Sequence, residues 1–204
     1  TLAAATAFSV VSSLWLRRRA SDTWTDLVAY LAIVAAACSS LLWLQWPDLL
    51  LPGGGADLAH HLQLVEYIDR HGRLVHDPPI EAYLGEMVHY TPGAHLLASL
   101  SGQWTGTDGF HTIYCVLVAS VALKVGLIFL IARRSVDGPL PLAILAPVLL
   151  LLPCAFFFES FTRYSYVPQV VSEWFAVSAW WAVAAWNDRP SLQPLAIFAV
   201  SEDV

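Results

Sequence analysis

The sequence predicts an all-α membrane protein: a polytopic bundle of transmembrane helices with a long outer loop that carries two amphipathic surface helices. Composition is the first reason, because 57% of the 204 residues are hydrophobic and only 13% are charged, which few water-soluble domains match. The second is that the apolar residues form runs of about 17 to 25, enough to cross a bilayer core of about 30 Å as a helix. The third is one long polar segment, which holds or borders all seven histidines.

Four or five apolar runs are expected to form membrane spans. Residues Trp24 to Trp46 make a complete span with tryptophans at both edges, where membrane proteins carry aromatic belts. The other predicted spans cover residues 1–16, 111–132, 140–158 and 170–186, and a candidate sixth begins near residue 192. Because the chain opens at Thr1 in apolar sequence and stops at Val204 just after another apolar run, we expect it to be part of a longer protein.

Basic residues give the orientation of these spans. Alternating spans place one set of arginines on the cytoplasmic side, where they are usually enriched: Arg17, Arg18, Arg19, Arg133, Arg134 and Arg189. The opposite side holds fewer, despite its longer loop: Arg70, Arg73 and Arg163. The chain therefore divides into residues 1–46 with two spans, an extracytoplasmic loop at 47–110, and residues 111–204 with three further spans and the start of a next one. We expect a multi-pass protein of the cell membrane.

Charged and thiol side chains are rare inside the predicted spans. Lys124 is the one basic residue there, and we expect its side chain to reach the cytoplasmic interface, with a functional role as the alternative. Cys38, Cys115 and Cys154 lie in apolar segments without metal-binding spacing, which predicts buried free thiols. The formal net charge of −6 argues against a nucleic-acid partner.

The outer loop begins with a predicted amphipathic helix that is expected to lie flat on the membrane. Its apolar side chains recur at three and four residues: Leu58, Leu62, Val65 and Ile68. Gly72 would end this helix, since glycine commonly follows the last turn. A second amphipathic helix is expected from Thr91, as N-cap, and Pro92, in the first turn, to about Trp104. The stretch between the two helices, residues 76–89, is predicted to be irregular.

Histidine is concentrated in or beside this loop: His60, His61, His71, His76, His89, His95 and His111. Polar residues must collect outside the spans, but this does not explain a preference for histidine over lysine or serine. On the first loop helix, Asp57, His60 and His61 stand three and four positions apart, so a carboxylate and an imidazole can point to one spot. If a metal ion is bound there, Asp57 and His61 are its expected ligands.

An apolar helix is thus followed by two loop motifs: Gly55-Ala56-Asp57-Leu58-Ala59-His60-His61 and Glu86-Met87-Val88-His89-Tyr90-Thr91-Pro92-Gly93. In this arrangement the chain resembles the GT-C superfamily of membrane glycosyltransferases, especially the mannosyltransferase-like members that use dolichyl- or polyprenyl-phosphate sugars. The resemblance implies two surface helices in the first outer loop and an essential aspartate near its start, which is Asp57 here. It also implies a polyprenyl-phosphate-linked sugar as the donor.

Sugar transfer gives a role to each candidate residue, so we expect the protein to be an enzyme. Asp57 is the expected general base that deprotonates the acceptor hydroxyl. Arg163, with an interface anchor as the alternative, is expected to stabilise charge on the leaving phosphate, as would a divalent cation. The expected substrate-binding residues are His60, His61, Glu86, His89 and Tyr90, together with Arg163.

Two other classes stay open. One is a metal-binding or transport protein in which histidines of the loop, with Asp57, bind zinc or a similar ion. A transporter is expected to carry polar residues near mid-membrane, and the predicted spans have few. The other is a noncatalytic membrane scaffold with the loop as a docking surface.

Overall fold

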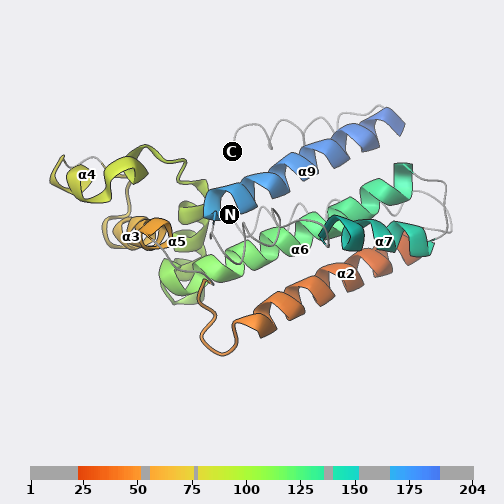
Figure 1. The fold of residues 1–204 in the computed structure, drawn as a ribbon, viewed down its shortest axis with the longest axis horizontal. Helices are drawn as coiled ribbons and strands as arrows, with labels where there is room; N and C mark the ends of the chain where they lie inside the picture. Colours follow the sequence, from red (N-terminus) through yellow and green to blue (C-terminus); the bar gives the residue numbers. More distant parts are fainter. Residues whose placement is uncertain (1–22, 52–55, 76–77, 136–139, 152–165, 189–204) are drawn as a thin grey trace.

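The computed structural model describes residues 23–51, 56–75, 78–135, 140–151 and 166–188, and all regular structure within these ranges is helical. The predicted all-α class is confirmed for them. The long helices α2 (Thr23–Leu44), α6 (Gly109–Ser135) and α9 (Val167–Asp188) run along one axis, with the shorter α7 (Leu140–Leu151) beside α6 (Figure 1). The remaining elements gather at one end of α6: α3 (Ala56–His71), α4 (Pro78–Leu84), the 3-10 helix η1 (Gly85–His89) and α5 (Gly93–Thr105).

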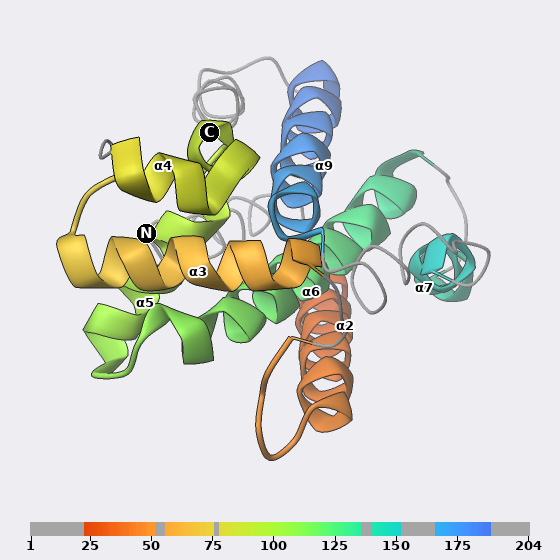
Figure 2. The same ribbon diagram turned by 60° about the vertical axis from the view of Figure 1, so that its left-hand side comes forward.

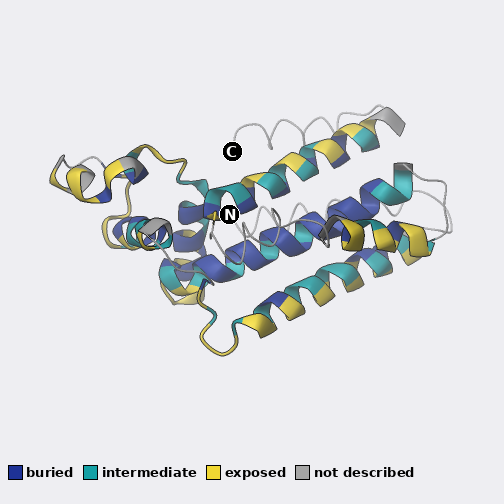
Figure 3. Ribbon diagram, viewed as in Figure 1, coloured by how far each residue is buried: buried dark blue, intermediate teal, exposed yellow. Residues whose placement is uncertain are grey.

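α6 is the central helix, and contacts near its two ends fix the direction of α2. Near one end, the Tyr114 hydroxyl donates a hydrogen bond to the Leu41 carbonyl. Near the other end, Arg133 Nε donates to Asp26 Oδ1 at 2.9 Å. α2 and α6 are therefore antiparallel. Most of α6 is buried between its neighbours, whereas α2 keeps an exposed face along its length (Figure 3).

α9 runs parallel to α6. Lys124 forms an ion pair with Glu173, and farther along both helices the Arg134 guanidinium lies over the Trp181 ring, 5.7 Å from its centroid. α9 comes after α6 in the chain and lies beside it. Two such helices can be parallel only if the chain between them passes back to the level at which the first helix began. α7 takes up part of that return.

Two of the described helices are long and apolar enough to cross a membrane, at Trp24–Leu44 and Gly109–Arg134. They match the predicted spans 24–46 and 111–132. The predicted span 140–158 is described only as the shorter apolar helix α7, and 170–186 is the helix α9, whose sequence is more polar and includes Glu173. The predicted spans at 1–16 and from residue 192 lie outside the described residues.

α3, α4, η1 and α5 form a compact unit that we call the loop subdomain. α3 lies across the ends of the long helices instead of along them (Figures 1 and 2). The subdomain has a small core of its own, to which α3, α4 and η1 contribute: Leu64, Tyr67, Ile68, Val75, Leu84 and Met87. The prediction that residues 76–89 are irregular is wrong for 78–89, because Pro78 and Pro79 start a helix, as proline in a first turn can.

The ends of the two loop helices agree with the sequence to within a residue. α3 ends at His71, and Gly72 follows with a φ of +62°, the left-handed conformation that favours glycine after a helix. α5 begins at Gly93, so Pro92 and not Thr91 takes the N-cap position, and no side chain caps this end. α5 ends at Thr105, one residue after the predicted end, and Gly106 follows with a φ of +74°.

The apolar face of α3 packs against protein. Leu58, Leu62 and Val65 contact the core formed with α5 and α6, and Ile68 lies in the core of the loop subdomain. The apolar stripe from which a helix flat on the membrane is predicted is therefore already covered by protein.

Candidate functional site

Two histidines from different helices meet inside the loop subdomain. His61 of α3 and His95 of α5 are both fully buried, and His61 Nδ1 lies 2.9 Å from His95 Nε2, within hydrogen-bond distance. The two rings stack with their centroids 5.1 Å apart and an interplanar angle of 28°. Tyr90, between η1 and α5, places its ring edge-on to His61 at 5.4 Å. α3, the segment after η1 and α5 therefore converge on one aromatic cluster.

Burial keeps His95 uncharged at neutral pH. The pKa of His95 falls from 6.5 to about 3, first because burial disfavours the charged ring and second because His61 lies beside it. The Pro92 carbonyl, one turn earlier, acts in the opposite direction. Because the contact joins two ring nitrogens, one must donate and the other accept, so the protonated nitrogen of His95 depends on which nitrogen of His61 carries hydrogen.

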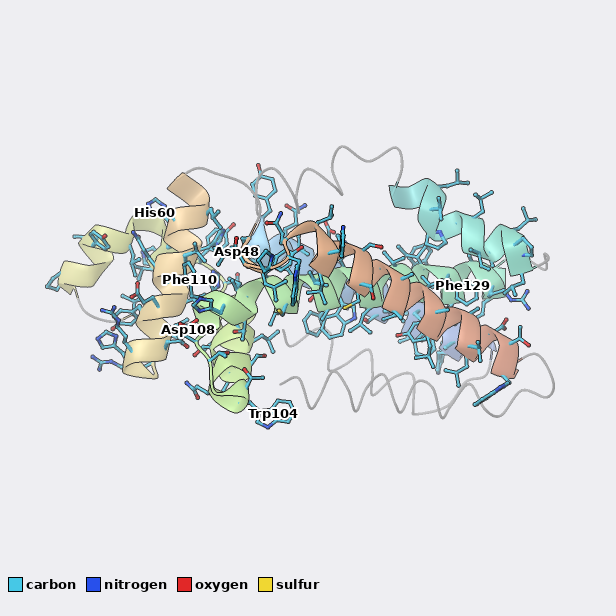
Figure 4. The ribbon with its side chains drawn as sticks, turned by 90° about the horizontal axis from the view of Figure 1, so that it is seen from below. Asp48, His60, Trp104, Asp108, Phe110 and Phe129 are labelled. Carbon is cyan, nitrogen blue, oxygen red and sulfur yellow. The ribbon has the colours of Figure 1, made fainter. Side chains whose placement is uncertain are left out.

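Among the other predicted site residues that the structure describes, Tyr90 is the one in ring contact with the pair. Asp57 stands in the first turn of α3, four positions before His61 and so on the same face of the helix, although its side chain lies outside the described part. His60 is half-buried on α3 (Figure 4), and His89 is exposed at the end of η1. The side chain of Glu86 is also outside the described part, as is the whole of Arg163.

Two more histidines stabilise helix ends and take no part in the site. His71 Nδ1 lies 2.9 Å from the Tyr67 carbonyl in the last turn of α3, and its ring stacks on Tyr67. Asp108 Oδ1 accepts the backbone N–H of His111 at 2.9 Å and lies 2.6 Å from His111 Nδ1, at the start of α6. These bonds, the backbone one first, lower the pKa of Asp108. The concentration of histidine in the loop thus has more than one cause.

The subdomain is joined to α6 by a second carboxylate of α3. Asp69 Oδ2 accepts the backbone N–H of Gly109 at 2.6 Å, which satisfies a donor that the first turn of α6 would otherwise leave open. Gly109 fits there because a Cβ would stand 2.5 Å from Val65 Cγ1. Figure 4 shows Asp108 and Phe110 beside α3 at this junction. The position of the His61 and His95 pair relative to α6 is therefore fixed by a short, direct contact.

Metal binding has only partial support in the described residues. His61 and His95 supply two imidazoles at one point, but no third histidine, cysteine, aspartate or glutamate joins them within the described part of the chain. The side chain of the predicted ligand Asp57 lies outside the described part of the chain.

Sequence reasoning missed the partnership of His61 and His95, which are separated by 34 positions. A signal was present, because His61 stands three residues after Leu58 and four before Val65, in the apolar stripe of its helix. A histidine in such a stripe needs a buried polar partner.

Comparisons with protein-family models, curated proteins and solved structures find no match for this chain.

Proposed function

We propose that this chain belongs to a multi-pass membrane glycosyltransferase that moves a sugar from a polyprenyl-phosphate donor to an acceptor hydroxyl at the outer face of the cell membrane. One observation carries the proposal. A helical subdomain sits at the end of two candidate spans, opens with Asp57, and encloses a buried histidine pair one helical turn later. A polyprenyl donor holds its phosphate at the membrane surface, which is the level at which such a subdomain would meet it.

The direction of the long helices supports the multi-pass part of the proposal. α2 is antiparallel to α6, and α9 is parallel to it, so the chain between α6 and α9 must return along the bundle. Arg133 and Arg134 lie at the end of α6 that is farthest from the loop subdomain. The usual enrichment of basic residues on the cytoplasmic side then puts residues 47–110 outside.

In the proposed reaction, the Asp57 carboxylate takes the proton of the acceptor hydroxyl. The acceptor oxygen forms a bond to the anomeric carbon of the sugar, and the bond between that carbon and the phosphate oxygen breaks. The phosphate oxygen leaves with the electron pair as polyprenyl phosphate, whose added charge Arg163 would stabilise. Asp57 needs a fixed position for this task, and the rigid contact of α3 with α5 through His61 and His95 would provide it.

Sugar recognition is assigned to predicted site residues that are exposed or half-buried, and to Glu86. His60 is half-buried and His89 is exposed, so both can reach a ligand, and Tyr90 combines a 41% exposed side chain with its contact to His61. Glu86, one turn before His89, completes this group by its place in the chain. Imidazole, phenol and carboxylate groups all bond to sugar hydroxyls.

The proposal is tested by sugar transfer in membranes that contain the full-length protein and a synthetic polyprenyl-phosphate sugar. Asp57→Asn should lower the transfer rate by about 100-fold or more, as loss of a general base does, at an unchanged amount of folded protein. Glu66→Gln is the matched control: it makes the same change on α3, at an exposed carboxylate paired with Arg70, where little stability is at stake. Unchanged transfer in Asp57→Asn would contradict the proposal.

The histidine pair also keeps metal binding as a second candidate function. Two buried imidazoles in contact are suitable ligands for zinc or a similar ion. Metal analysis of the purified protein, with His61→Ala and His95→Ala as comparisons, distinguishes the two. Bound metal that both variants lose would favour this candidate, and metal-free wild-type protein would exclude it.

A further inference from the structure

A charged pair lies in the interior of the bundle, away from the loop subdomain. Lys124 of α6 donates from Nζ to Glu173 Oε2 of α9, and Gln169 Nε2 donates to Glu173 Oε1 at 3.1 Å. Only 3% of the Lys124 side chain and 26% of the Glu173 side chain is exposed. Neither residue belongs to the proposed sugar-transfer site. Their burial needs a separate explanation.

The depth of Lys124 follows from the contacts between α6 and α2. Tyr114 contacts Leu41 near one end of α2, and Arg133 contacts Asp26 near the other. Lys124 is ten residues from Tyr114 and nine from Arg133, which at 1.5 Å per residue places it about 15 Å and 14 Å from these levels. A bilayer core is about 30 Å thick, so Lys124 lies at its middle if α2 spans it.

With α2 across the bilayer, this depth is incompatible with the predicted extension of Lys124 to the cytoplasmic interface. A lysine stem has only four carbons, too few to cover half of the bilayer core. Lys124 is instead paired with Glu173. Glu173 lies within the predicted span 170–186, and the sequence analysis assigns it no role. An unpaired lysine at mid-membrane is costly, and a carboxylate partner on the neighbouring helix α9 offsets part of that cost.

The outer face of α9 is consistent with lipid. Its large exposed side chains are apolar and stand three residues apart: Trp180, Val183 and Trp186. α9 has 22 residues, which is long enough to cross a bilayer. Its sequence is nevertheless too polar for it to count as a candidate span, in part because of Glu173.

We propose that Lys124 and Glu173 form an ion pair at the middle of the bilayer, and that this pair allows α9 to cross the membrane as the parallel neighbour of α6. The inference rests on the multi-pass part of the proposed function and extends it to a helix that is not apolar enough to cross alone. α9 then depends on α6 for its place in the membrane.

The crossing of α9 is tested by cysteine labelling in intact cells, using the full-length protein with the chain's native cysteines replaced by alanine. Tyr166→Cys, just before α9, should react with a membrane-impermeant maleimide added outside. Trp186→Cys, near the end of α9, should react only after permeabilisation. Reaction of both positions from the same side would overturn the proposal.

The ion pair is tested by a double-mutant cycle on the same protein. Lys124→Leu and Glu173→Leu should each lower the yield of folded protein roughly tenfold, because each leaves one buried charge without its partner. The double variant should recover most of that yield, since it removes both charges. Ser172→Leu, at the neighbouring exposed position of α9, is the control and should change little.

Equal losses in the single and double variants would overturn the ion pair. Neither this cycle nor the labelling measures sugar transfer. A failed transfer assay would therefore leave both results standing, and failed labelling would leave the role of Asp57 to its own test.

Discussion

Protonation of the buried histidine pair should weaken the loop subdomain as the pH falls. The pKa of His95 is about 3 in the folded protein and 6.5 when the ring is exposed, so between these values the unfolded chain binds the extra proton. The stability that the neutral ring contributes is complete above pH 6.5 and is lost progressively toward pH 3. At pH 5, about 1.5 units below the exposed value, the loss is about 2 kcal/mol.

The assay is chemical unfolding of the detergent-solubilised protein at pH 8 and pH 5, followed by tryptophan fluorescence. Wild type should lose about 2 kcal/mol between the two values through His95. His95→Gln should be less stable at pH 8 and should lose clearly less on acidification, because glutamine does not titrate. His89→Gln, at an exposed position, should keep the wild-type loss. An equal loss in wild type and His95→Gln would refute the reasoning.

Two further predictions concern the packing of α6. Gly126→Ala should lower the stability by about 1 to 3 kcal/mol in thermal or chemical unfolding, because the added carbon would stand 2.6 Å from Tyr30 Cε2. Gly93→Ala, with nothing within 4 Å, is its control, and equal effects would contradict the packing argument. Asp69→Ala should cost about 1 kcal/mol and speed hydrogen exchange in the first turn of α6, since Gly109 loses its acceptor. Unchanged exchange there would show that the bond contributes little.

The helices could be predicted where hydropathy alone decides them. The predicted span 24–46 and the helix Thr23–Leu44 nearly coincide, and α6 extends the predicted 111–132 by a few residues at each end. The extra residues at the C-terminal end, Arg133 to Ser135, are polar, so an apolar run could not reveal them. The stop of α3 at Gly72 was equally predictable, because glycine takes the left-handed conformation that ends a helix.

Contacts between distant parts of the chain could not be predicted in this way. His61 and His95 are far apart in sequence, and a periodic pattern shows only that each faces inward. The same holds for Lys124 and Glu173, whose partnership depends on α9 running parallel to α6. The segment 78–89, predicted to be irregular, is helical because Pro78 and Pro79 both fit into the first turn of a short helix.

Asp57 could be selected as a candidate only from its motif and its place on α3. The contact of His61, one turn after Asp57, with His95 explains how α3 is held against α5.

The most direct test of the central claim is the rate of sugar transfer from a labelled polyprenyl-phosphate sugar by the full-length protein in sealed vesicles. The account predicts labelled product with wild type and Glu66→Gln, and at least about a 100-fold lower rate with Asp57→Asn at equal amounts of folded protein. Product formation at the wild-type rate by Asp57→Asn, or no product from wild type, would contradict it.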